Sequence, residues 1–254
     1  MPIDVNVQDL RPLKNFGDGC PGCGSILALK LLLQSLDNFI LVNGTGSVTP
    51  FIKDVPFIHA GHNAVSVAKG IAQAVRDEKN QPKVVVFAGD GATAMNLNAL
   101  MSSDDILYVC ANDFAYTAID HQLKRSFARQ LAHTASYVAT ACVSYPHDYI
   151  AKLKKAASMT GLRYIEVLAP CPVSWGYESS NTIEVGRVTV ETGIYPVFEV
   201  ENDTVNLTKR PNRLEPVEHL NQVQKKMQIK PNQLQQTQDK VNRKWKALTE
   251  GRLL

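Results

Sequence analysis

Short apolar runs alternate with helical patterns along most of this chain. Continuous runs bounded by glycine are typical of strands buried on both faces, as in a parallel sheet. The predicted strands lie within 39–49, where a strand runs into a glycine-rich turn, at 84–88, 106–111 and 136–145, and from 162 to the break at Pro170. A further short strand is predicted just before the helix that begins at Asn63. The predicted helices lie between them, at 25–36, 63–76, 92–102, 146–161 and 183–191. This alternation predicts an α/β fold with a doubly wound, mostly parallel sheet.

The two ends of the chain depart from this alternation. Residues 1–16 are polar and predict an extended arm, so the α/β domain is expected over 17–208 and includes a hairpin near its end. Residues 209–254 predict a helical C-terminal tail broken at Pro231. The second helix of the tail has one apolar stripe, formed by Val241, Trp245 and Leu248. Such a tail either contacts a partner subunit or packs on its own domain.

Two predicted strands deliver a carboxylate at their C-terminal ends. The run from Val84 ends in Gly89-Asp90-Gly91, and the next ends in Asn112-Asp113. Open α/β sheets bind ligands at this edge, the glycines allow close approach of an anion, and the following helix N-terminus offers free N–H groups. Mg²⁺ bridging a diphosphate suits these oxygen ligands. A plain strand-turn-helix without a ligand is the alternative, since Gly-Asp-Gly is common in turns.

Cysteine and histidine also stand near predicted turns. Cys20-Pro-Gly-Cys23 precedes the first helix and suits Zn²⁺, a redox pair or an iron–sulfur cluster, although a chance pair in a turn has the same spacing. The count of five cysteines is odd, which argues against a disulfide framework. His59 and His62 flank the second turn, where a histidine serves either as a hydrogen-bonded structural residue or as a cofactor contact.

Composition restricts the classes of function. The 254 residues are 44% hydrophobic and 20% charged, values typical of a globular protein with a sizeable core. No signal pattern opens the sequence and no apolar run approaches the ~20 residues of a membrane span, so a cytoplasmic protein without a membrane partner is expected. The tail from 202 to 254 is basic, but its charges alternate with Gln and Asn, which favours a solvated helical face over a nucleic-acid site.

Several motifs together resemble the β subunit of the 2-oxoacid:ferredoxin oxidoreductases, most closely the pyruvate synthase type. These motifs are CPGCG at 20–24, NGTG at 43–46, FIHAGHNA at 57–64, GDGATA at 89–94, YVCANDFAY at 108–116, YVATACVSYPHDYI at 137–150, YIEVLAPCPVSWGY at 164–177 and TIEVGRVTVETGIYPVFEVEN at 182–202. They follow one another in the order of the family and cover nearly the whole chain.

The resemblance implies that the chain binds thiamine diphosphate through Mg²⁺. The metal ligands implied are Asp90, Asp113 and the backbone carbonyl of Ala115. The cofactor-binding residues implied are Gly46, Ser47, His59, Gly89, Asp90, Gly91, Ala92 and Asn112. No catalytic acid or base is implied on this chain, because the group that activates the aminopyrimidine is expected on the α subunit. The cofactor itself supplies the carbanion chemistry.

The resemblance also implies a [4Fe–4S] cluster held by four cysteines. Three of them match Cys20, Cys23 and Cys171, while Ser47 stands where the family has the fourth. A serine oxygen is a harder and poorer ligand for iron than a thiolate. Cys110 and Cys142 lie in apolar strands and are interpreted as core residues. A three-cysteine cluster, a non-cysteine fourth ligand and no cluster all remain open.

Three hypotheses of function follow. In the first, the chain acts with α, γ and δ-type subunits in oxidative decarboxylation of a 2-oxoacid with coenzyme A, and electrons pass to ferredoxin. In the second, it is a non-catalytic scaffold or regulatory subunit, a hypothesis motivated by Ser47, by Ala118-Ile119 in place of the usual Asn-Thr and by a short helix after Gly91. In the third, it is a thiamine enzyme that reacts non-oxidatively.

Overall fold

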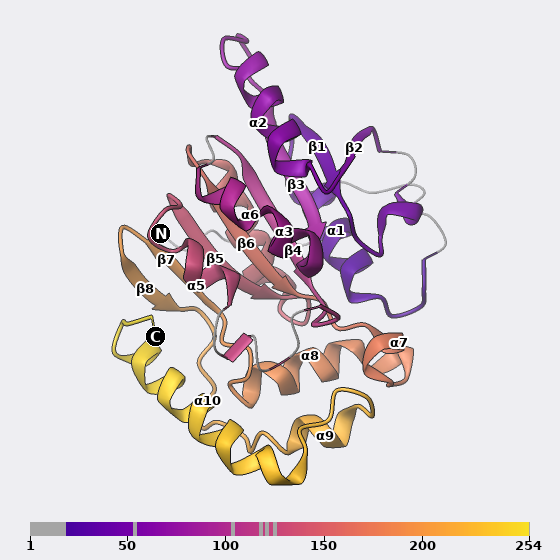
Figure 1. The fold of residues 1–254 in the computed structure, drawn as a ribbon, viewed down its shortest axis with the longest axis vertical. Helices are drawn as coiled ribbons and strands as arrows, with labels where there is room; N and C mark the ends of the chain where they lie inside the picture. Colours follow the sequence, from indigo (N-terminus) through magenta and orange to yellow (C-terminus); the bar gives the residue numbers. More distant parts are fainter. Residues whose placement is uncertain are drawn as a thin grey trace.

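The computed structural model describes residues 19–52, 55–102, 105–116, 119, 122–123 and 126–253. Within them, eight strands form one sheet in the order β2-β1-β3-β4-β6-β5-β7-β8 (Figure 1). The strands are β1 (Phe39–Gly44), β2 (Phe57–Gly61), β3 (Lys83–Gly89), β4 (Leu107–Asn112), β5 (Tyr137–Cys142), β6 (Arg163–Leu168), β7 (Phe198–Glu201) and β8 (Thr204–Leu207). The predicted N-terminal arm, 1–16, lies outside the described residues, as does Ala118.

Strands β1 to β6 pair in parallel, and β7 and β8 add an antiparallel hairpin at one edge. The strands β4, β5 and β6 are buried at every position, as expected of strands covered on both faces. The prediction of a doubly wound, mostly parallel α/β sheet is therefore confirmed.

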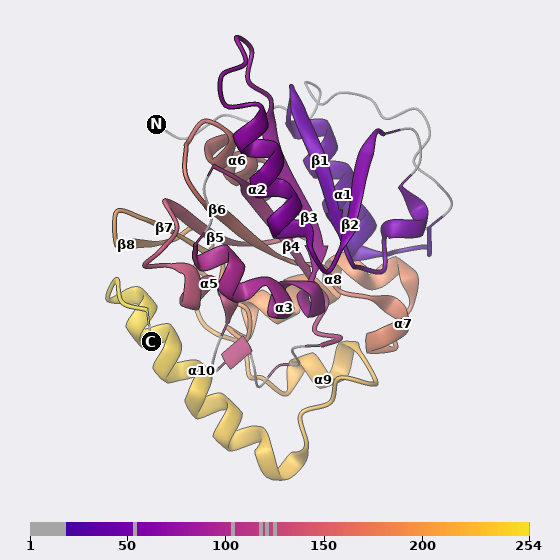
Figure 2. The same ribbon diagram turned by 45° about the horizontal axis from the view of Figure 1, so that its top comes forward.

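Helices cover both faces of the sheet. One face packs on α1 (Gly24–Ser35) and α6 (Pro146–Ala157). The other packs on α2 (Ala64–Ala74), α3 (Asp90–Met101) and α5 (Phe127–Leu131), which Figure 2 shows in front of the sheet. Alternate residues of one strand therefore enter opposite cores: Val85 and Phe87 pack on the α1 side, and Val84 and Val86 on the α2 side.

A third core lies beyond the C-terminal ends of the central strands. It joins α7 (Pro172–Trp175), α8 (Thr182–Glu191), α9 (His219–Val223) and α10 (Leu234–Thr249) around Phe114 and Trp175. The rings of Phe114 and Trp175 stack with centroids 5.5 Å apart. Phe114 belongs to the turn that follows β4, so this core packs against that turn.

The C-terminal helix α10 packs on its own domain. Val241 and Leu248 are buried in two different cores, and the ammonium group of the buried Lys244 donates a hydrogen bond to the carbonyl of Gln122 at 3.0 Å. Of the two arrangements expected for the tail, the structure shows the one in which it packs on its own domain. The division at residues 208 and 209 stays a prediction.

The sheet order places a crevice between β1 and β3. From β1 the chain goes to β2 on one side and then returns through α2 to β3 on the other side. Loops that leave neighbouring strands in opposite directions open a crevice at the carboxyl ends of those strands, the usual position of a ligand site in such sheets.

Candidate functional site

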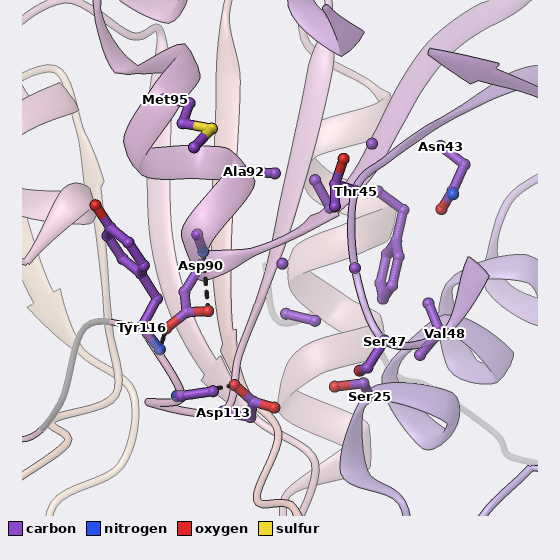
Figure 3. Close-up of a pocket in the computed structure, with 18 of the residues that line it drawn as sticks. Ser25, Asn43, Thr45, Ser47, Val48, Asp90, Ala92, Met95, Asp113 and Tyr116 are labelled. Carbon is purple, nitrogen blue, oxygen red and sulfur yellow. Dashed lines mark hydrogen bonds between the residues drawn. The ribbon is translucent and has the colours of Figure 1, made fainter. Parts of the chain in front are cut away.

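A cavity of about 270 Å³ lies at this crevice. Its walls come from the loop after β1, the start of α3, the turn after β4 and the first turn of α1 (Figure 3). The lining residues are Ser25, Asn43, Gly44, Thr45, Gly46, Ser47, Val48, His62, Phe87, Ala88, Gly89, Asp90, Gly91, Ala92, Met95, Ala111, Asp113, Ala115 and Tyr116.

Asp90 is the first residue of α3 and is 5% exposed. Its carboxylate accepts hydrogen bonds from the backbone N–H of Gly91 at 2.9 Å and of Tyr116 at 3.0 Å. The helix start is anchored to β3 by the hydroxyl of Thr93, which donates to the carbonyl of Gly89 at 2.8 Å. These contacts hold the carboxylate at the cavity wall and leave it close to the positive end of the helix.

Asp113 follows β4 and lies on the same side of the cavity as Asp90 (Figure 3). Burial raises the pKa of Asp113 to about 6, the hydrogen bond from the N–H of Ala115 opposes this shift, and the negative charge of Asp90 adds to it. A bound cation would relieve the cost of ionising Asp113. Both aspartates line the cavity together with Ala115.

The loop after β1 approaches the loop after β3 closely. The N–H of Gly89 donates to the carbonyl of Thr45 at 3.1 Å, and a Cβ on Gly46 would lie 3.2 Å from the nitrogen of Gly89. A Cβ at position 46 would therefore require the two loops to move apart by a few tenths of an ångström.

Asn43 offers an unused acceptor to the cavity. Its amide nitrogen donates to the hydroxyl of Thr49 at 2.8 Å and lies 3.3 Å from Nδ1 of His59. Its oxygen is buried and has no hydrogen-bond partner within the described part of the chain. Buried polar atoms are normally paired, so this oxygen indicates a ligand that carries a hydrogen-bond donor.

The structure brings most of the predicted site residues to one cavity. Those on its wall are Gly46, Ser47, Gly89, Asp90, Gly91, Ala92, Asp113 and Ala115. Asn112 and His59 are not on the wall. Asn112 is fully buried and donates to Glu166 at 3.0 Å, whereas His59 is exposed and contacts the amide of Asn43. In place of His59, the neighbouring His62 lines the cavity.

Sequence reasoning missed Asn43, Met95 and Tyr116 as wall residues. Asn43 carried a signal, since a polar residue interrupting an apolar strand next to Gly44 has to find a partner. Met95 and Tyr116 are 65% and 63% exposed at the cavity, an unusual degree for large apolar side chains. Only the tertiary structure reveals this exposure.

The three predicted cluster cysteines lie on two turns that contact each other. The N–H of Gly24 donates to the carbonyl of Pro170 at 3.1 Å, and the hydroxyl of Thr182 donates to the carbonyl of Gly22 at 2.6 Å. Burial raises the pKa of Cys23, and Cys20 and Cys171 raise it further through their charges. Among the described residues, however, no three His, Cys, Asp or Glu side chains are arranged as a metal-binding group.

Ser47 lies on the cavity wall. It lines the cavity together with Ser25 of α1, on the side opposite Asp90 in Figure 3. Cys110 and Cys142 are fully buried in β4 and β5, as their apolar sequence context predicted. The described helices all fall short of the length and hydropathy that a bilayer crossing requires.

The sequence is similar to those of several known proteins. The family model "Thiamine pyrophosphate enzyme, C-terminal TPP binding domain" matches residues 51–167. The pyruvate synthase subunit PorB of Methanocaldococcus jannaschii is 34% identical over 91% of this chain and 94% of its own length. The ketoisovalerate oxidoreductase subunit VorB of Pyrococcus abyssi is 30% identical over 88% of this chain and 89% of its own.

A solved 2-oxoglutarate:ferredoxin oxidoreductase from Magnetococcus marinus, with 2-oxoglutarate, coenzyme A and succinyl-CoA bound, aligns over 65% of this chain and 67% of its own, with 21% identity and a TM-score of 0.48. The length and identity of the PorB match establish kinship on their own, and they confirm the resemblance found in the motifs. The chain belongs to the pyruvate synthase PorB family of 2-oxoacid:ferredoxin oxidoreductase β subunits.

Proposed function

We propose that this chain is the thiamine-diphosphate-binding β subunit of a pyruvate synthase, which decarboxylates pyruvate oxidatively together with its α, γ and δ-type partners. The observation that carries this proposal is the cavity at the ends of β1 and β3, where Asp90 and Asp113 share one wall. Family membership supports the reaction class. Coenzyme A, a 2-oxoacid and ferredoxin are the small-molecule and protein partners that this reaction requires.

The residues present fit Mg²⁺ and a diphosphate. Carboxylate and carbonyl oxygens are the ligands that Mg²⁺ prefers, and the wall supplies Asp90, Asp113 and Ala115. The start of α3 would take the diphosphate, because the positive end of the helix dipole favours an anion there. The unpaired oxygen of Asn43 would accept a hydrogen bond from the bound cofactor.

This chain's own residues bind and orient. Asp90 and Asp113 would hold the metal, and Gly46 keeps the loop after β1 close to Gly89. Thiamine diphosphate, when bound, would supply the carbanion chemistry of the reaction. The rim residues Met95 and Tyr116 are exposed, which agrees with a site completed by the α subunit.

The iron–sulfur centre is part of the same proposal. Cys20, Cys23 and Cys171 would supply three thiolates from the two contacting turns. A cluster there would carry electrons away from the cofactor. The fourth family position holds Ser47, so a three-cysteine cluster, a non-cysteine fourth ligand and no cluster are the three arrangements to be distinguished.

Anaerobic co-purification of the chain with its α partner tests the proposal. Bound thiamine diphosphate and brown iron–sulfur absorbance together are expected. If the purified complex contains thiamine diphosphate but no iron, a non-oxidative thiamine enzyme replaces the proposal. If it contains neither thiamine diphosphate nor iron, a non-catalytic scaffold or regulatory subunit replaces it.

A further inference from the structure

The turn after β4 contains a residue in an unfavourable backbone conformation. Phe114 has a φ of 59°, in the left-handed region that costs a non-glycine residue free energy. Its two neighbours, Asp113 and Ala115, line the cavity, while Phe114 packs on Trp175 in the third core. The reversal at Phe114 therefore directs the two proposed metal ligands to the same side.

Asn112 stabilises this conformation. Its side-chain oxygen accepts a hydrogen bond from the N–H of Phe114 at 2.9 Å, and its amide nitrogen donates to Oε1 of Glu166 at 3.0 Å. An amide turned by 180° would present a donor to Phe114 and an acceptor to Glu166, and both bonds would be lost. The orientation of Asn112 therefore depends on an acceptor at position 166.

Both carboxylate oxygens of Glu166 accept hydrogen bonds. The residue is fully buried on β6, and its other oxygen accepts from the N–H of Ala128 at 3.2 Å and from the hydroxyl of Tyr164 at 3.4 Å. Its partners on these bonds are all donors, so Oε1 remains an acceptor facing Asn112. The carboxylate does not line the cavity.

We propose that Glu166 is a positioning residue for the metal site: it fixes the amide of Asn112, which fixes the turn at Phe114, which holds Asp113 and Ala115 toward the metal. This inference rests on the proposed function. It assigns to Asn112 a supporting role in place of the direct cofactor contact that its motif implied. Supporting residues around metal ligands commonly change affinity by about 10- to 100-fold.

The test is a Mg²⁺ titration of the complex with its α partner at saturating thiamine diphosphate, followed by calorimetry. Glu166→Leu and Asn112→Ala are each expected to weaken Mg²⁺ binding about tenfold. Because Glu166 acts through Asn112, the double variant is expected to match Asn112→Ala within about twofold. Wild-type affinity in Glu166→Leu, or losses that multiply in the double variant, would overturn the inference.

Thr140→Val is the matched control. Thr140 is buried, pairs with Glu166 across the strands β5 and β6, and has a hydroxyl that donates to Pro196 at 2.8 Å and accepts from Phe198 at 2.9 Å. Loss of this hydroxyl is expected to lower the melting temperature without changing Mg²⁺ affinity. If Thr140→Val also binds Mg²⁺ about tenfold more weakly, the effect of Glu166→Leu reflects only a general structural role.

If Glu166→Leu does not fold, Glu166→Met replaces it. Methionine is close to glutamate in length and offers Asn112 no strong acceptor. Weakened Mg²⁺ binding is again expected, and wild-type affinity would refute the inference. A wild-type complex that binds no thiamine diphosphate would instead refute the proposed function.

Discussion

The backbone N–H of Tyr116 donates a hydrogen bond to Oδ2 of Asp90 across 3.0 Å. This bond joins the turn after β4 to the first residue of α3, two segments separated by 26 positions in the sequence. The same carboxylate therefore closes the cavity and is a proposed ligand of the metal within it. The Asp90 side chain therefore contributes both to the local fold and to the proposed metal binding.

Substitution of Asp90 tests this coupling. Asp90→Ala removes the acceptor of two backbone N–H groups as well as the charge. We expect the fold to be retained, thiamine diphosphate binding with Mg²⁺ to weaken at least about a hundredfold, and the melting temperature to fall by about 4 °C or more. Calorimetric titration and a thermal scan measure both. Cofactor affinity equal to that of the wild type would remove Asp90 from the metal site.

Asp113 predicts a pH dependence. The pKa of its carboxyl is raised to about 6 in the folded protein, above the ordinary value of 3.8. Between these values the folded state binds more protons than the unfolded state, so the metal-free protein gains stability as the pH falls from 7 to about 4. Mg²⁺ requires the ionised form, and its affinity is expected to increase as the pH rises through about 6.

Asp113→Asn separates the two effects, because the amide oxygen still accepts from Ala115. At pH 7.5 the metal-free variant is expected to melt about 2–4 °C higher than the wild type, after allowance for partial exposure, and to lose Mg²⁺ binding. Asp37→Asn, at an exposed carboxylate, serves as the control and should change neither property. A melting temperature that is lower in Asp113→Asn would contradict the assigned burial cost.

The contact of the two loops predicts different results at two glycines. Gly46→Ala places a Cβ 3.2 Å from the nitrogen of Gly89, and we expect cofactor affinity to fall about fivefold or more through a shift of the loops. Gly70→Ala on α2 meets nothing within 4 Å and is expected to raise stability by about 1 kcal/mol without changing binding. Equal affinity in both variants would show that the cavity tolerates a wider loop.

The fourth cluster position can be tested by restoring a thiol. Ser47→Cys is expected to increase the iron and sulfide retained per chain after anaerobic reconstitution and to slow bleaching in air, since thiolate is the better iron ligand. Ser25→Cys places a thiol on the same wall and controls for adventitious iron binding. If both variants retain iron equally, Ser47 does not occupy the fourth position.

Cys142→Ser completes this set of variants. Cys142 is fully buried in the core, so its loss is expected to lower stability while leaving iron content unchanged. Loss of iron in this variant would instead indicate that Cys142 contributes to the cluster site.

The sequence alone was sufficient for the sheet, the helices between its strands and the two acidic strand ends. These features are local: a continuous apolar run with glycine behind it forms a buried strand, and parallel strands place their ends together. The motifs gave the family because each is a continuous stretch of sequence that can be read without the tertiary structure. The strands β3 and β4 were found within two residues of their actual ends.

The tertiary structure decided which side chains face the cavity. Asn112 and Asp113 are neighbours in the sequence, but one points to Glu166 and the other lines the cavity. His62 reaches the wall where His59 had been predicted. Side chains in turns are directed by the contacts around them, and for Asn112 the deciding partner lies 54 positions away. Such distant pairings depend on the packed sheet and leave no periodic signal in the chain.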